Sequence, residues 1–325
     1  MKHIKLFFPL ILLVMFCVPD AVRGGAGFIT RAPHLYEVRQ QLRLVKTGGT
    51  VENLKLTVPM FLLNNLPPYQ RVTAFRSDTA QLRYYASETA PKMEYTLKRW
   101  ADSRDIQMEL FYTIENQAIE YDLPKYSGRN SVETGYLQPE PGIESTTEAI
   151  ADYANSLTGR EPYPLDKAIK LFYYVNSKLD YRTSSEATHS ALRTLKRKYG
   201  NCEDFSLLYI ALCRSVGIPA RFVTGYRFDP VQVPQYEVDL AKFGHAWVEV
   251  NLPGIGWIPV EPTFSYTVNG EKKVNYDFFG RLLEEDRHLL FNYSRNSGAQ
   301  CSWSHDPRVK TDVKLVTKLV IRRIK

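Results

Sequence analysis

"YGNCEDFSLLYIALCRSVGIPAR", residues 199–221, sets one cysteine between a Gly-Asn turn and a long apolar helical pattern. Gly200 would let the chain turn tightly into this helix. Cys202 would then lie in the first turn, where backbone N–H groups lack partners. Thiols react as thiolates, and the positive end of a helix favours this anion. The stretch therefore predicts a reactive thiol at Cys202, although a cysteine at a helix start, taken singly, is more often structural.

Three more helices are expected before this stretch and several strands after it. Capping residues and apolar residues at helical spacing predict helices over residues 145–159, 163–181 and 190–201. Strand patterns follow in "ARFVTGYRF", "GHAWVEVN" and "GWIPVEP". A run of helices followed by an antiparallel sheet indicates an α+β domain.

The first half of the chain has a different pattern. Short segments rich in Val, Thr, Tyr and Phe, with turn signals between them, predict an immunoglobulin-like β-sandwich over residues 28–125. Residues 126–144 are rich in Pro, Gly and Ser and indicate a linker. We expect the α+β domain to occupy residues 145–325 and to end in the strand "VKLVTKLVIRRIK". Its basic side chains would keep an edge strand soluble, and weak contact with an anionic surface is the alternative.

A thiolate nucleophile needs a neighbouring base. His245 follows Gly244 at the start of a predicted strand, so its imidazole would project from a rigid element. Glu261 comes after a Pro-Gly turn, and a hairpin would bring its carboxylate beside His245, where it could hold the imidazole tautomer. Taken singly, a histidine beside a tryptophan is more often packed, and such a glutamate more often caps a turn. His288, in "EEDRHLLF", fits a surface position.

The blocks "GNCEDFSLLYIALCRSVGIPARFVTGY", "HAWVEV" and "GWIPVEPT" resemble the three signature blocks of the transglutaminase-like superfamily, in its exported bacterial type with an N-terminal sandwich. This resemblance implies a papain-like core with Cys202 as nucleophile, His245 as base and acid, and Glu261 as the orienting residue. The family usually has Asp at the last position, and we expect a retained triad. The backbone N–H of Cys202 is a natural oxyanion donor, and Tyr181 or His189 is a candidate for the second.

The expected function is that of a cysteine enzyme that cleaves or transfers peptide or glutamine amides through a thioester. Its substrate would be a protein or peptide, cell-wall peptide included, and no cofactor is expected. The alternative is a non-catalytic scaffold of the cell envelope. A metal site made of Cys202, His245 and Glu261 is a third idea, but zinc ligands usually come in close-spaced pairs. The chain has a net charge of +7, yet it lacks the aromatic-plus-basic layout of a nucleic-acid reader.

The N-terminus predicts export. "MKHIK" is basic, "LFFPLILLVMFCV" is apolar, and "AVRGGAG" is rich in small residues, which is the order of a secretory signal over residues 1–26. We therefore expect a periplasmic or extracellular protein, tethered to the membrane if the segment is not cleaved. Cleavage would leave three of the four cysteines, and this odd number indicates at least one free thiol. Cys213, on the apolar stripe of the helix, is expected in the core.

Overall fold

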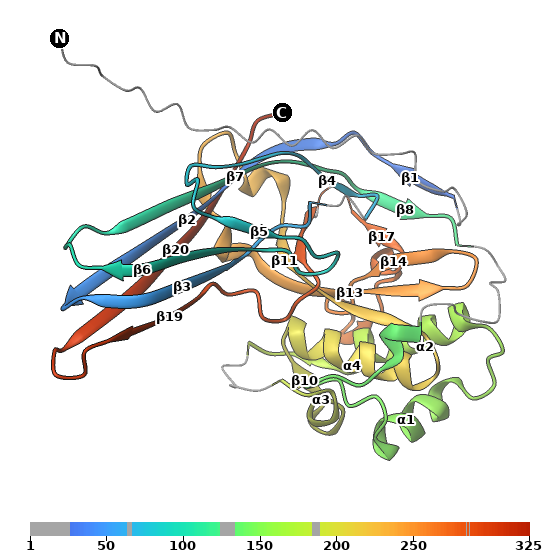
Figure 1. Cartoon of the computed structure of the whole chain (residues 1–325). Helices are drawn as coiled ribbons and strands as arrows, with labels where there is room; N and C mark the ends of the chain where they lie inside the picture. Colours follow the sequence, from blue (N-terminus) through green and yellow to red (C-terminus); the bar gives the residue numbers. More distant parts are fainter. Residues whose placement is uncertain (1–26, 64–66, 124–133, 184–188, 284, 286) are drawn as a thin grey trace, which may run out of the picture.

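The computed structural model describes residues 27–63, 67–123, 134–183, 189–283, 285 and 287–325. The predicted signal segment, residues 1–26, and residues 126–133 of the expected linker lie outside this part of the chain. Long strands form one half of the molecule, and four helices pack under a shorter sheet in the other half (Figure 1). No helix of the described residues is long and apolar enough to cross a lipid bilayer.

The first half is a β-sandwich, as predicted. Its two antiparallel sheets have the strand orders β12-β20-β2-β7-β4 and β19-β3-β6-β5. The strands are β2 (His34–Gly48), β3 (Val51–Pro59), β4 (Gln70–Ser77), β5 (Arg83–Tyr85), β6 (Lys92–Trp100), β7 (Ile106–Asn116), β12 (Val238–Asp239), β19 (Gln300–His305) and β20 (Thr311–Arg323). Burial alternates along β2 and β7 because successive side chains of a strand point to opposite faces. The buried set packs between the two sheets as one core.

The last two strands differ from the expectation. We predicted that the C-terminal strand would belong to the 145–325 domain, but β20 pairs with β2 along all of its 13 residues, and β19 pairs with β3. The physical reason is the apolar face of β20, where Val313 and Ile321 are buried in the sandwich core. The other edge of β20 meets only the short β12. Over most of its length β20 is thus an edge strand within the described structure, as its basic residues suggested.

The second half contains the four expected helices and an antiparallel sheet. The helices are α1 (Glu148–Thr158), α2 (Pro164–Lys178), α3 (Ala191–Arg197) and α4 (Cys202–Ser215). The sheet has the order β14-β13-β11-β18, with β11 (Ala220–Phe228), β13 (Gly244–Leu252), β14 (Gly256–Val260) and β18 (Arg287–Asn292). The middle and end of α4 are buried, Cys213 included, because the helix lies between the other helices and the sheet. An all-round buried helix explains the continuous apolar run of its sequence.

Smaller elements complete the fold. Strands β1 (Phe28–Thr30), β8 (Ile119–Tyr121) and β17 (Arg281–Leu282) form a three-stranded sheet, β9 (Asp180–Tyr181) pairs with β10 (Tyr199–Gly200), and β15 (Tyr266–Val268) pairs with β16 (Glu271–Lys273). The short 3₁₀ turns are η1 (Thr134–Leu137), η2 (Pro230–Gln232), η3 (Leu240–Phe243) and η4 (Tyr276–Phe278).

The two halves share strands rather than meeting at a simple boundary. On β18, Leu289 and Phe291 face the sandwich core, whereas Leu290 between them faces the core that contains the helices. On β11, Phe228 likewise lies in the sandwich core and Val223 in the helical one. Both strands are therefore covered on two sides, and the sandwich is part of what holds the sheet beside α4 in place.

The role of β20 can be tested with one buried and one exposed position on the same strand. Ile321→Ala should lower the free energy of unfolding by about 2–5 kcal/mol, because it removes packed methyl groups from the sandwich core. Lys318→Ala, at an exposed position, should change it by less than about 0.5 kcal/mol. Denaturant unfolding of both variants measures the difference. Equal and small effects would mean that β20 is not docked in this core.

Candidate active site

A capping box sets the position of Cys202. The side-chain oxygen of Asn201 accepts hydrogen bonds from the backbone N–H groups of Glu203 (3.0 Å) and Asp204 (3.2 Å). In return, the Asp204 carboxylate accepts one from the backbone N–H of Asn201 (3.0 Å). These reciprocal bonds start α4 at Cys202. The thiol therefore lies at the positive end of the helix dipole, as predicted.

Gly200 is needed for a reason other than the predicted tight turn. A Cβ at this position would lie 2.4 Å from Cβ of Asp204. Asp204 is fully buried, and its carboxylate meets Nδ1 of His189 at 2.9 Å and the guanidinium of Arg197 at 2.7 Å. A buried charge needs such partners. Nε2 of His189 is 3.5 Å from a carboxylate oxygen of Glu203, so both ring nitrogens of His189 face acidic groups.

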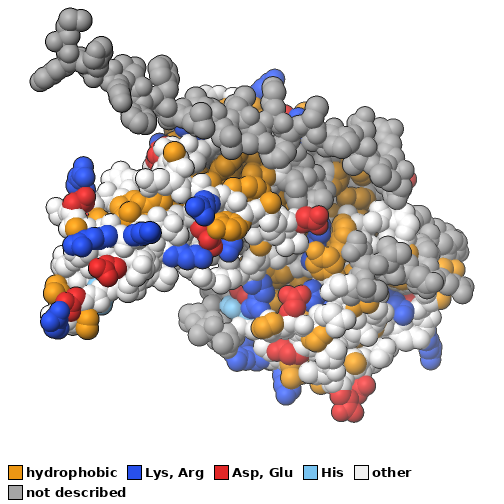
Figure 2. All heavy atoms as spheres, in the orientation of Figure 1, with side chains coloured by type: hydrophobic (Ala, Val, Ile, Leu, Met, Phe, Trp, Pro, Cys, Tyr) orange, Lys and Arg blue, Asp and Glu red, His pale blue; other side chains and the backbone are white. Residues whose placement is uncertain are grey.

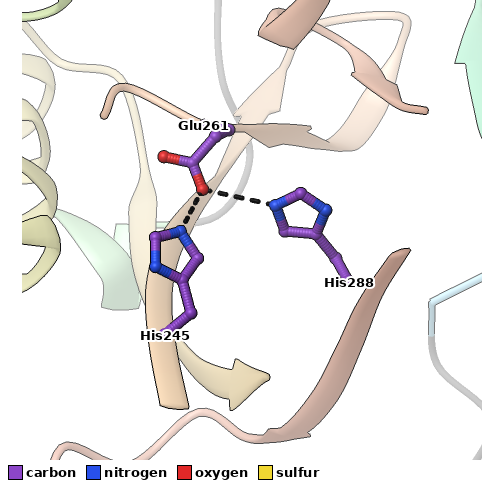
Figure 3. A group of neighbouring side chains, drawn as sticks. All are labelled: His245, Glu261 and His288. Atoms are coloured by element: carbon purple, nitrogen blue, oxygen red, sulfur yellow. Dashed lines mark hydrogen bonds and ion pairs between the residues drawn. The ribbon is translucent and has the colours of Figure 1, made fainter. Parts of the chain in front are cut away.

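The predicted hairpin is present. Strands β13 and β14 pair from Val248–Val260 to Leu252–Gly256, which places His245 and Glu261 at the same end of the pair. Nε2 of His245 is 2.5 Å from Oε2 of Glu261 (Figure 3). The other carboxylate oxygen, Oε1, accepts a hydrogen bond from the backbone N–H of Thr263 at 2.8 Å. The glutamate thus reaches the imidazole despite its extra methylene.

His245 and Glu261 each stabilise the charged form of the other. Burial by itself would raise the pKa of the Glu261 carboxyl, but His245 and then His288 hold it well below its usual range. Burial would lower the pKa of His245, but the Glu261 carboxylate and a hydrogen bond with Cys202 raise it to about 10. Because Nε2 of His245 faces Glu261, Nδ1 is the nitrogen left for the thiol. The structure therefore links Cys202, His245 and Glu261 in one chain of contacts.

The sequence analysis was wrong about His288. This residue is only 1% exposed, and it lies on β18 among residues that are all buried. Its Nε2 is 3.3 Å from Oε2 of Glu261, the same oxygen that meets His245 (Figure 3). The continuous apolar run "HLLF" was the available signal, because a strand buried on both faces lacks the usual polar alternation. The sequence nevertheless contains nothing that would place this strand beside β11.

Gly225 explains how histidines from two separated strands meet one carboxylate. It lies on β11, the strand between β13 and β18, directly opposite His245. A Cβ at Gly225 would lie 2.5 Å from the ring of Trp247, so this ring occupies the space above the glycine. The buried Trp247 ring stacks on His245 (6.3 Å between centroids) and packs edge-on against His288 (5.1 Å). It thereby supports both imidazoles.

Aromatic and basic side chains lie around His245 and Tyr181. Phe264 also stacks on His245 (5.3 Å between centroids), and the guanidinium of Arg227 lies 3.6 Å from the centroid of Phe264. Tyr181 is 49% exposed, and its pKa is raised by burial and then by the charges of Cys202 and Glu261. Its hydroxyl therefore lies within electrostatic reach of the thiol. Cys202 is only half-buried, so this side of the site is accessible.

The two histidines and the glutamate are also a possible metal-ligand set. Their ligand atoms all lie within 4.8 Å of one another, and zinc accepts such a combination of donors. Two ligand atoms on one tetrahedral zinc would be about 3.4 Å apart, given metal–ligand bonds of about 2.1 Å. The distance of 2.5 Å between His245 and Glu261 is instead that of a strong hydrogen bond. The arrangement fits a proton between these two groups better than a metal ion.

The raised pKa of His245 can be measured directly. We expect the imidazole to stay protonated until about pH 10, against about 6.5 in the unfolded chain. The contribution of protonated His245 to the free energy of unfolding is therefore fully present below pH 6.5, and it is lost as the pH rises from 6.5 to 10. In Glu261→Gln the pKa of His245 should fall, because only the contact with Cys202 then opposes the effect of burial. NMR titration of the imidazole carbons measures both values. Titration of the unmodified protein near pH 6.5 would contradict this charge arrangement.

The role of Gly225 can be tested against the neighbouring Gly244. Gly225→Ala should lower the unfolding free energy by about 1–3 kcal/mol or more, because the added methyl group overlaps both the backbone oxygen of Leu289 and the ring of Trp247. Gly244→Ala should have little effect, since the nearest atom, the carbonyl oxygen of Ala241, is 3.5 Å from the new Cβ. Thermal unfolding reports the loss of stability, and the one-dimensional NMR signal of the Trp247 indole N–H reports its displacement. Equal responses of the two variants would argue against a specific contact at Gly225.

Comparisons with known proteins agree with this architecture. Residues 151–262 match the family described as "Transglutaminase-like superfamily". An uncharacterized protein of Haemophilus influenzae is 25% identical over 256 residues, which cover 70% of this chain and 68% of that protein. The uncharacterized protein YebA of Bacillus subtilis is 41% identical over 76 residues, which cover 22% of this chain and 10% of YebA.

A solved structure has the same fold along nearly the whole chain. It is that of a proposed cysteine protease from Cytophaga hutchinsonii, with a TM-score of 0.56, 15% sequence identity, and coverage of 91% of this chain and 99% of the other. This identity is too low to carry more than the fold. Together with the family match, however, it covers α1 to β14, the elements that hold Cys202, His245 and Glu261. Residues 151–262 of this chain are therefore a transglutaminase-like core.

Proposed function

We propose that this protein is an exported cysteine enzyme that acts on peptide or glutamine amides through a thioester on Cys202. The observation that carries the proposal is the chain of contacts Cys202–His245–Glu261 at the N-terminus of α4. A thiolate at this position is stabilised by the helix end and by the imidazolium. The carboxylate keeps a proton on Nε2 and turns Nδ1 toward the sulfur, which is the orienting role of a triad acid.

The reaction would proceed in two halves. The Cys202 thiolate attacks the carbonyl carbon of the amide, and the oxyanion that forms accepts a hydrogen bond from the backbone N–H of Cys202. His245 gives its Nδ1 proton to the leaving amine, the C–N bond breaks, and a thioester remains. A second nucleophile then gives a proton to His245 and attacks the thioester. The C–S bond breaks, and the thiolate is restored.

The second nucleophile decides the outcome. Water would yield a carboxylic acid and make the protein a peptidase or amidase, whereas a primary amine would yield a new amide bond. Cys202 is half-buried, so part of this residue is open to solvent. Tyr181 lies near the thiol and remains our candidate for the second oxyanion donor. The substrate class is a protein or peptide, and cell-wall peptides belong to it if the protein is exported.

Export and surface contact rest on separate observations. Export rests on the tripartite N-terminal sequence, residues 1–26. Lys and Arg side chains are spread over the sandwich, but acidic side chains lie among them (Figure 2). Ion pairs on this surface include Arg43–Asp105 and Arg71–Glu115. Contact of β20 with an anionic surface therefore stays a prediction, and it is not needed for the proposed reaction.

A scaffold without activity is the second candidate, and replacement of the usual Asp by Glu261 was its main support. The contacts of Glu261 favour the enzyme instead, because the carboxylate meets His245 at 2.5 Å and is braced by the N–H of Thr263. A scaffold would have no need for a capped thiol in contact with a charged imidazole.

Iodoacetamide labelling at about pH 5.5, followed by mass spectrometry, tests the reactive thiol. Cys202 should be labelled within minutes, because its sulfur contacts the protonated imidazole of His245 at the start of a helix, the setting of reactive cysteines. His245→Ala should slow this labelling by about 100-fold or more, since general-base and ion-pair partners contribute factors of this size. Cys202→Ser provides the background from the buried Cys213 and the half-buried Cys301. Slow labelling of the unmodified protein would favour the scaffold.

The two chemical outcomes can be separated in one assay. The protein is incubated with a glutamine-rich polypeptide and a biotinylated primary amine. New N-termini indicate hydrolysis, and incorporated biotin indicates amide transfer. Cys202→Ser should abolish either product. Product that persists in this variant would rule out a thioester at Cys202.

A further inference from the structure

We propose that His288 is a positioning residue of the active site, which holds Glu261 so that this carboxylate can orient His245. The inference deepens the proposed function and rests on it. It extends the contacts of the site to four side chains from α4, β13, β18 and the end of β14. No signal in the chain order links β18 to the other three elements, because the fold alone brings this strand to the site.

Three donors converge on the Glu261 carboxylate. Nε2 of His245 lies 2.5 Å and Nε2 of His288 3.3 Å from Oε2, and the N–H of Thr263 lies 2.8 Å from Oε1. The side chains of Glu261 and His288 are both inaccessible to solvent. A carboxylate in such an environment has no water to compensate for a lost donor. Each donor therefore restricts the direction in which the oxygens point.

His288 is itself fixed from two sides. The side-chain amide of Asn116, on β7 of the sandwich, donates a hydrogen bond to the backbone oxygen of His288 (2.8 Å). The ring packs against the edge of Trp247, with 5.1 Å between the centroids. Asn116 and Trp247 are both buried. The backbone of His288 is thus held by the sandwich, and its imidazole packs against the sheet that carries His245.

The same geometry explains why glutamate fits here. An aspartate would withdraw the carboxylate by about 1.5 Å, the length of one C–C bond. One oxygen could then not stay within hydrogen-bond distance of both imidazoles while the other accepts from Thr263. Glu261 and His288 therefore belong together as a matched pair, and the departure from aspartate need not indicate a decaying site.

Charged and titratable groups around this pair come from several elements. His245 faces Glu261 from β13, and Cys202 contacts His245 from the start of α4. Arg227 lies directly opposite His288 on β11. Tyr181, on β9, lies within electrostatic reach of Glu261. The pH dependence of Cys202 labelling in a His288 variant must therefore be compared with that of a control variant in which all these groups are unchanged.

The experiment measures the rate of Cys202 alkylation by iodoacetamide from pH 4.5 to 10 in the full chain. In His288→Leu, which removes the donor, the rate at pH 5.5 should fall about tenfold, the effect of one hydrogen bond to a charged group. The pH range over which the labelling rate stays constant should also narrow, because a less well oriented Glu261 carboxylate stabilises the protonated form of His245 less. His288→Gln keeps an N–H donor and should restore the rate to within about threefold of the unmodified protein.

Leu289→Ala is the matched control for general destabilisation. It truncates the next residue of β18, whose side chain faces the sandwich core and not Glu261. At a temperature well below its melting point, this variant should keep the pH profile of the unmodified protein. A shift in Leu289→Ala equal to that in His288→Leu would overturn the proposal, as would an unchanged profile in His288→Leu.

A double-mutant cycle separates an effect through Glu261 from any other role. If His288 acts by holding this carboxylate, His288→Leu should have no further effect in a Glu261→Ala background. The proposal would be overturned if the two substitutions reduced the labelling rate independently, so that the double variant showed the product of the two single effects. The proposed function fails separately, through slow labelling of the unmodified protein at pH 5.5. Fast labelling of that protein with an unchanged His288→Leu variant would overturn only the role of His288.

Discussion

The buried carboxylate of Glu261 is the constraint on which the active-site half of the structure depends. A charge without access to water is costly unless hydrogen bonds and an opposite charge surround it. Here the partners come from His245 on β13, His288 on β18 and the backbone N–H of Thr263. The two histidines come from other strands, so the cost of burying the ionised carboxylate is offset only when the sheet has assembled. Its charge then raises the pKa of the imidazole beside Cys202.

The sheet that carries these partners packs between the two cores, so the sandwich helps to hold them in position. Alternate residues of β18 face the sandwich and the helices, and Asn116 of the sandwich holds the backbone of His288. The sandwich is therefore a structural support of the site rather than a separate appended module. It also encloses the chain end, since β19 and β20 pair with β3 and β2. Loss of the last strand would expose one hydrogen-bonding edge of β2, the strand that pairs with β7 on its other edge.

Local signals accounted for much of what could be predicted. The Gly-Asn turn before Cys202, the helical spacing of apolar residues and the Pro-Gly turn between β13 and β14 act over fewer than twenty residues. They predicted the four helices, the start of α4 at Cys202 and the juxtaposition of His245 with Glu261. The buried Cys213 followed from the same helical pattern. The close contact of Gly200 with Asp204 was not predicted, because it depends on how far that side chain is drawn into the core.

The sequence by itself determined the type and order of the elements, the cap that places Cys202 at a helix start, and the hairpin that carries the imidazole and its acid. Those features follow from backbone periodicity, capping and turn chemistry between near neighbours. Only the tertiary structure decided that β20 joins the sandwich, that Gly225 makes room for Trp247, and that His288 shares an oxygen of Glu261. Strand pairing between distant segments is chosen by the burial of apolar faces across the whole fold. A pattern read along the chain shows that a strand exists, and it contains no information on the partner with which that strand pairs.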